Sequence, residues 1–296
     1  MGMGGVRACA LAALAMALAG VATPAAVRAH AGVDELLDAS RAAVTTRPAD
    51  PSARLQLANT LRLAGDWDGA LAALDAAADR GADADEVAGT RAAVLLEAGR
   101  AAAALAELDH LLERRPDAPG VHLERGRALL ALGRADEAAG ALGIAVATLP
   151  APRPEHVLLH RDALLARGRT ADAVRALDGG IARLGPIPSL QLPAIDLEIR
   201  LGRPDAALAR IDALLASSGR NPAWLVRRAE ILDDAGRAAE ARAAYAEAGG
   251  IIAAHRGGRR IHAFDRLADQ IAAALAATPP GGNEICGLQS DAAWLP

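Results

Sequence analysis

One short phrase recurs along this chain at an almost constant interval, and it constrains the fold more than any other feature. Residues 130–142 read LALGRADEAAGAL, and related phrases surround five other glycines. A period of 34 or 35 residues separates the six central glycines, which are Gly65, Gly99, Gly133, Gly168, Gly202 and Gly236. Such a period predicts a stack of similar helical units rather than one large globular core.

Residues at fixed distances from each glycine indicate two helices joined by a tight turn. An alanine stands five residues after every glycine, and a Leu, Ile or Tyr stands nine residues after it. These two positions fall on one face of a helix. Four residues before the glycine, five units carry leucine and the remaining unit carries Glu198. We therefore expect Ala138 to be buried in a helix contact and Ala135, nearer the turn, to be exposed.

Glycine and proline mark the ends of the predicted helices. The central glycine supplies the left-handed backbone that ends the first helix of a unit. Proline is tolerated at a helix start because its missing N–H would have no helical partner there. Prolines stand at or near the start of five units: Pro51, Pro119, Pro154, Pro188 and Pro222.

This pattern resembles the tetratricopeptide repeat over about residues 51–254. The shared features are a small residue within the first helix (Ala58, Ala92, Gly126, Ala229), the turn glycine and the alanine of the second helix. The chain departs from the family pattern where leucine replaces an aromatic residue in four units, and at the small position of units four and five. The resemblance implies an all-α, right-handed superhelical solenoid of about six repeats, at 51–84, 85–118, 119–152, 154–187, 188–221 and 222–254.

The composition suits thin layers of helices, since 52% of the residues are hydrophobic but only 2% are aromatic. Segments outside the repeats are predicted to be a signal peptide at 1–31, capping helices at 32–50 and 259–278, and a disordered tail at 279–296. The signal is indicated by Arg7, an apolar run from Ala8 to Ala22, and the A-x-A sequence ending at Ala31. The apolar run is shorter than the roughly 20 residues that a membrane span needs. We therefore expect a periplasmic or secreted protein, released by Sec-type cleavage near Ala31, whose mature chain does not insert into a membrane.

Charge and cysteine content limit the partners. A formal net charge of −4 argues against nucleic-acid binding, which favours a basic surface. Only Cys286 remains after the predicted cleavage, so packing without an intramolecular disulfide must hold the fold. We interpret Cys286 as an inert thiol in the tail, and the alternative is a mixed disulfide with a partner.

Few residues suggest chemistry, and the sequence holds no phosphate-binding glycine loop, Cys-x-x-Cys pair or nucleophile elbow. His156 and His160 lie four residues apart on one helical face, a spacing that can hold zinc with Glu155 or Asp162. We favour ordinary packing, because a third ligand on that face is not evident. Three arginines in residues 256–260 could contact an anion, and we interpret this segment instead as a solvated hinge. We expect no catalytic residue, metal or cofactor.

The resemblance implies that a partner lies in a concave groove lined by the first helices of the repeats. Positions ten, six and three residues before each glycine are expected to face it. We predict an apolar strip with arginines toward the first units and carboxylates toward the last. The candidate residues are Leu55, Asn59, Arg62, Leu123, Arg127, Leu158, Asp162, Leu165, Leu192, Asp196, Val226, Glu230 and Asp233. An alternative is that the leucines only pack between helices.

These observations favour an exported, non-catalytic scaffold that binds a protein or peptide partner. One alternative is a subunit of an envelope machine for secretion, polysaccharide export or cytochrome maturation, which differs only in the partner. The other is a metal-dependent enzyme that uses His156 and His160.

Overall fold

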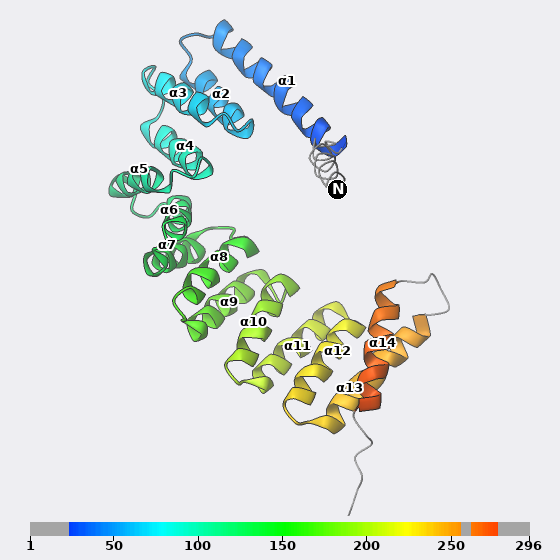
Figure 1. Cartoon of the computed structure of the whole chain (residues 1–296). Helices are drawn as coiled ribbons and strands as arrows, with labels where there is room; N and C mark the ends of the chain where they lie inside the picture. The colour runs from blue at the N-terminus through cyan, green and yellow to red at the C-terminus, as the bar shows by residue number, and fades with distance from the viewer. Residues whose placement is uncertain (1–23, 256–261, 278–296) are drawn as a thin grey trace, which may run out of the picture. The chain divides into compact units, whose positions relative to one another are not determined.

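The computed structural model describes residues 24–255 and 262–277, and every regular element in these ranges is an α-helix (Figure 1). The first six helices are α1 (Pro24–Thr46), α2 (Pro51–Leu63), α3 (Trp67–Ala78), α4 (Ala84–Glu97), α5 (Ala101–Arg114) and α6 (Pro119–Ala131). They are followed by α7 (Ala135–Thr148), α8 (Pro154–Leu165), α9 (Thr170–Leu184), α10 (Pro188–Arg200), α11 (Pro204–Ser218), α12 (Pro222–Asp234), α13 (Ala238–His255) and α14 (His262–Ala277). The predicted all-α helix-turn-helix architecture is confirmed.

The chain divides into two compact units, residues 1–132 and residues 133–296. In the first unit, each described helix from α1 to α6 contacts the next helix along the chain, and α4 also contacts α2 and α6. In the second unit, consecutive helices from α7 to α14 contact each other, and α8 also contacts α10. Each unit is therefore held by contacts between neighbours, as a repeat array requires.

The turn glycines end the first helices as predicted. All six have positive φ, between 69° and 78°, which L side chains rarely adopt. At five of these turns the residue after the glycine donates its backbone N–H to a carbonyl one turn back in the helix, as from Asp66 to Leu61 at 2.9 Å and from Arg237 to Leu232 at 2.8 Å. These bonds satisfy carbonyls that the helix end would otherwise leave without a partner.

The helix starts also follow the sequence. Proline occupies the first turn of α2, α6, α8, α10 and α12. Asp50, Asp83 and Asn221 cap the N-termini of α2, α4 and α12 by accepting hydrogen bonds from backbone N–H groups of the first turn.

The core of the repeats is formed by the positions that the periodicity selected. The six alanines five residues after the glycines are 0–1% exposed. The residues nine after the glycines are also buried, from Leu74 in α3 to Tyr245 in α13. A small residue beside a large one, both without exposure, allows neighbouring helices to approach closely.

The expected exposure of Ala135 is wrong, since only 8% of this residue is exposed. Ala135, Ala138 and Leu142 are spaced by three and four residues, so all three lie on the same face of α7. The turn brings the first residue of the helix against the core, and Ala101 at the same place in α5 is buried as well.

One buried position in the second unit carries charge instead of leucine. Glu198 on α10 has a side chain 6% exposed and accepts a hydrogen bond from Arg210 Nη2 on α11 at 2.9 Å. Arg210 Nη1 lies 2.8 Å from Asp178 on α9. These three residues join three successive helices. Arg203 Nη1 lies 3.7 Å from Glu198 Oε2, and this oxygen and Arg210 Nε are buried without hydrogen-bond partners.

Several sequence predictions concern segments at the margins of the described ranges. Helix α1 covers the predicted capping segment and also includes Ala29–Ala31, where cleavage is expected. Helix α14 lies within the predicted C-terminal capping segment. Residues 1–23, the arginines of 256–260 and the tail with Cys286 lie outside the described residues.

Candidate functional site

A cleft of about 510 Å³ lies in the first unit, on α2, α4 and α6, which are the first helices of the first three repeats. It is lined by Asn59 and Arg62 from α2, by Gly89, Thr90, Ala93, Leu96 and Glu97 from α4, and by Glu124, Arg127 and Ala131 from α6. The contacts of α4 with α2 and α6 hold these three helices as adjacent walls.

The repeat register explains why these residues meet. Asn59, Ala93 and Arg127 each lie six residues before a turn glycine, so equivalent faces of three helices are aligned. Asn59, Arg62 and Arg127 are thus brought together as candidate groove residues. Leu55, which is buried, and Leu123, which is half-buried, are not among the residues that line the cleft.

Four residues of the cleft were not predicted from the sequence: Thr90, Glu97, Glu124 and Ala131. They lie nine or two residues before a turn glycine. Those positions are three and four residues from position six, so they share its helical face. They would have been identified if the predicted groove had included the positions nine and two residues before each glycine.

The charges of the cleft are paired within the protein. Arg62 Nη1 donates to Glu97 Oε1 across α2 and α4, and Arg127 Nη1 donates to Glu124 at 3.2 Å within α6. The two arginines and two glutamates give this cleft no net charge. Only 24% of the Arg62 side chain is exposed, so this residue forms part of the cleft wall more than it offers a free positive charge.

A second hollow of about 600 Å³ adjoins the cleft and shares Gly89 and Glu124 with it. Its other walls are Leu108 on α5, residues 115–118 of the connection, and Pro119, Gly120 and Val121 at the start of α6. Most of these side chains are apolar or absent.

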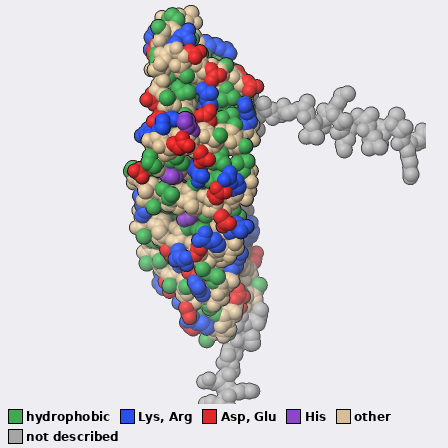
Figure 2. All heavy atoms as spheres, turned by 90° about the vertical axis from the view of Figure 1, so that its left-hand side faces the viewer, with side chains coloured by type: hydrophobic (Ala, Val, Ile, Leu, Met, Phe, Trp, Pro, Cys, Tyr) green, Lys and Arg blue, Asp and Glu red, His purple; other side chains and the backbone are tan. Residues whose placement is uncertain are grey.

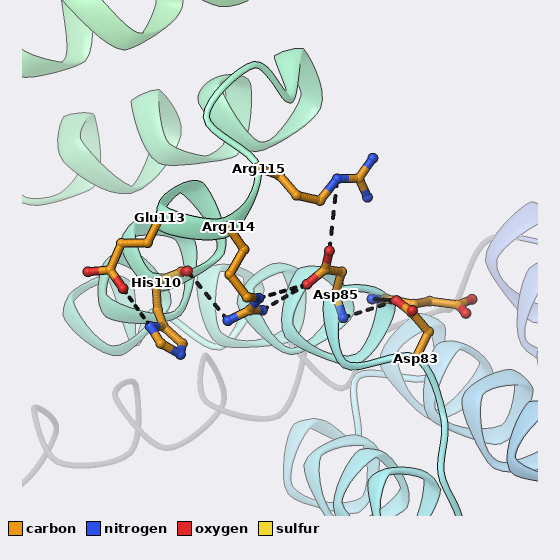
Figure 3. Close-up of polar contacts among 7 residues, drawn as sticks. Asp83, Asp85, His110, Glu113, Arg114 and Arg115 are labelled. Atoms are coloured by element: carbon orange, nitrogen blue, oxygen red, sulfur yellow. Dashed lines mark hydrogen bonds and ion pairs between the residues drawn. The ribbon is translucent and has the colours of Figure 1, made fainter.

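Ion pairs fix the connection that walls the second hollow (Figure 3). Asp85 on α4 accepts hydrogen bonds from Arg114 at 2.9–3.0 Å and lies 3.9 Å from Arg115 Nε. Asp83 caps the same helix through the backbone N–H groups of Asp85 and Glu86. These contacts tie the end of α5 to the start of α4 and so set the position of residues 115–118.

Two of the predicted groove carboxylates in the second unit, Asp196 and Glu230, form ion pairs. Asp196 and Glu230 both contact Arg227, at 2.8 and 3.1 Å, and Glu230 also accepts from Gln270 at 2.7 Å. Burial opposes the charge of Arg227, but its hydrogen bonds to Glu230 and Asp196 raise the pKa of this guanidinium above its usual value.

The remaining candidates of this unit vary in exposure. Asp162 is bonded by Arg161 at 2.6–2.9 Å, whereas Asp233 is exposed and makes no ion pair with the described residues. Leu158, Leu165 and Leu192 are half-buried, Leu192 packs against the buried cluster of α10 to α13, and Val226 belongs to that cluster. In the described part of this unit, Leu192 and Val226 therefore contribute to packing.

The two histidines serve helix packing. His156 is buried, with the backbone N of Arg153 3.3 Å from Nδ1 and its guanidinium 3.2–3.3 Å from Nε2. His160 packs against the bare backbone of Gly143, where an added Cβ would lie 3.3 Å from the ring. Burial, and then the charge of Arg169, lower the pKa of His160. The described residues contain no group of three ligands suited to a metal ion.

Charged side chains of both signs are interspersed with apolar ones over the face in Figure 2. No single-sign field covers that face. Among the described helices, none has the length and apolar content to cross a membrane.

Comparisons with known proteins agree with the repeat pattern. Two models of the tetratricopeptide repeat match residues 95–157 and 192–252. Among solved structures, a tetratricopeptide repeat protein from Parabacteroides merdae ATCC 43184 is 18% identical, with 83% of this chain and 96% of that chain covered and a TM-score of 0.47. MamA from Desulfovibrio magneticus RS-1 is 17% identical, with 58% and 97% covered and a TM-score of 0.47.

A structure of Naa15/Naa10 bound to HypK-THB is 18% identical to this chain, with a TM-score of 0.49. The alignment covers 83% of this chain but 37% of that one. The search of curated proteins found no match.

Proposed function

Since the chain belongs to the tetratricopeptide-repeat family, we propose that it is a non-catalytic scaffold that binds an extended segment of a partner protein in the cleft of α2, α4 and α6. The observation that carries this proposal is the meeting of Asn59, Ala93 and Arg127, from equivalent positions of three repeats, in one cleft of about 510 Å³. Clefts of this size with a few placed polar groups are the usual form of a binding site.

The chemistry of the cleft suits a polypeptide segment. Asn59 is exposed and carries both donors and an acceptor, and Thr90 adds a hydroxyl, so both can bond to the amides of an extended chain. Leu96 and Ala93 line the same cleft and offer apolar contact to the bound segment. Because the arginines and glutamates pair with each other, binding depends on shape and hydrogen bonds more than on net charge.

Filling the cleft tests this proposal. Ala93→Trp places a large ring between α2 and α6, and we expect it to weaken partner binding by about ten-fold or more. The matched control is Ala106→Trp, an exposed alanine of α5 that lines neither hollow. The mature protein and both variants are used as bait in envelope extract, and the affinity of the captured protein is then measured by calorimetry. Equal affinity for all three baits would refute the cleft as the site.

We also propose that the protein is exported. The support is the sequence of Arg7, the apolar run and the A-x-A at Ala29–Ala31. Expressed with its own N-terminus in a Gram-negative host, the protein is expected in the soluble periplasmic fraction with a sequence that begins at or near Gly32. Cleavage there would shorten α1 and would remove none of the residues that line the cleft or the adjoining hollow. An uncut N-terminus on protein recovered from cytosol or membranes would contradict export.

A further inference from the structure

Gly89 is an exception to the repeat pattern at the position ten residues before the turn glycine. The other five units carry a branched apolar residue there, namely Leu55, Leu123, Leu158, Leu192 and Val226. These side chains are buried or half-buried, so they fill the space beside their helices. The second repeat, residues 85–118, has no side chain at this position because Gly89 occupies it.

The missing side chain leaves open space in the structure. A Cβ built on Gly89 would meet only Leu111 Cδ2, at 4.0 Å, which is ordinary contact. The φ of Gly89 is not positive, so the backbone of α4 would accept any helical residue. The glycine is therefore required neither by the backbone nor by a close approach of another helix.

Gly89 also lies where the two hollows of the first unit meet. It lines both the cleft of about 510 Å³ and the adjoining hollow of about 600 Å³. The other residues that line the hollow are Leu108, Arg115, Pro116, Asp117, Ala118, Pro119, Gly120 and Val121. Five of these eight residues have apolar side chains, and the ion pairs of Asp85 with Arg114 and Arg115 hold the connection that contains residues 115–118.

The charges around Gly89 argue for an uncharged occupant. Glu124 is shared by both hollows and contacts Arg127, and Arg62 is held by Glu97. Arg115 and Asp117 also line the hollow, where Arg115 lies 3.9 Å from Asp85 and Asp117 is exposed. A charged side chain beside Gly89 would lose water without gaining an unpaired counter-charge from Arg62, Glu97, Glu124 or Arg127. An apolar side chain has no charge to desolvate, and it gains contact with the apolar residues that line the hollow.

We propose that the space beside Gly89 is a pocket for one uncharged apolar side chain of the bound segment, and that Gly89 determines the specificity of the site. The proposal rests on the proposed function, because it assumes that the segment lies in the cleft of α2, α4 and α6. A segment with a leucine-sized or aromatic residue at one fixed place would be selected over one with a charged or small residue there.

A peptide library tests the pocket with a defined probe. The full mature protein is used to select binders from phage-displayed random peptides, and the affinities of selected peptides are measured by fluorescence anisotropy. We expect the peptides to share one apolar residue at a fixed place. Gly89→Leu, which restores the residue typical of this position, should weaken their binding about ten-fold or more, since burial of one apolar side chain contributes on that order.

The substitution should not lower thermal stability, because leucine favours helix more than glycine does and the Cβ meets no close atom. Gly140→Leu is the matched control, at an exposed glycine of α7 with open space around it, and should leave binding unchanged. Gly89→Ala, which adds only the Cβ, should weaken binding less than Gly89→Leu and serves if the leucine variant unfolds.

The outcomes separate the pocket from the cleft. Peptides that are weakened by Ala93→Trp but not by Gly89→Leu or Gly89→Ala would overturn the pocket and leave the proposed function standing. Selected peptides with a charged residue at the fixed place would also overturn it. Peptides insensitive to all three substitutions, or the absence of any selected peptide, would overturn the proposed function together with the pocket.

Discussion

Replacing Glu198 with leucine is expected to lower the free energy of unfolding by about 3 kcal/mol, although leucine stands at this position in the other five repeats. Removing one member of a buried ion pair leaves the other charge with less compensation. Arg210 has only 14% of its side chain exposed and would keep Asp178 as its single close partner. The loss is measured by chemical denaturation at neutral pH.

The double variant Glu198→Leu, Arg210→Ala provides the control. Alanine occupies the position of Arg210 in four of the other repeats, as at Ala73 and Ala244. Replacing both members of a buried pair by apolar residues is often neutral or stabilising, so the double variant should recover at least the stability of the wild-type protein. Equal losses for the single and double variants would show that the pair contributes through packing and not through charge.

Replacing Gly180 with leucine is expected to destabilise the protein by about 2 kcal/mol. A Cβ on Gly180 in α9 would lie 2.6 Å from Val157 Cγ1 in α8, and Val157 is fully buried. Overpacking of this kind costs about 3 kcal/mol, and the better helix propensity of leucine offsets about 1 kcal/mol. Leucine occupies the same repeat position at Leu111 and Leu214, so the sequence pattern alone would permit the change.

The adjacent glycine is a matched control for this change. Gly179 lies in the same helix, is exposed and has no atom within 4 Å of an added Cβ. Gly179→Leu should stabilise the protein by about 1 kcal/mol through helix propensity. Calorimetric melting of both variants measures the difference, and similar shifts in Tm for Gly179→Leu and Gly180→Leu would contradict the helix contact.

The turns and the core followed from local sequence because their causes are local. A left-handed residue is needed where each first helix ends, and glycine supplies it at Gly65 and its five equivalents. The buried alanines and the large residues one turn later could be read from helical spacing alone. The same spacing would have placed Ala135 in the core, since it lies three residues before Ala138.

The candidate site was predicted less well because it depends on pairing between helices. The sequence indicates that Arg62, Asp196 and Glu230 face one side of their helices. It does not show that Glu97 neutralises Arg62 or that Arg227 lies between the two carboxylates. Likewise, only the structure shows that Gly89 lines both the cleft and the adjoining hollow.

Site-specific photo-cross-linking can test directly whether a partner segment lies in the cleft of α2, α4 and α6. A photoreactive amino acid is placed at Thr90, which lines the cleft, and in a second protein at Ala106, which is exposed outside it. After irradiation in envelope extract, we predict a cross-linked partner from Thr90 and none from Ala106. A partner cross-linked from Ala106 but not from Thr90 would contradict the account.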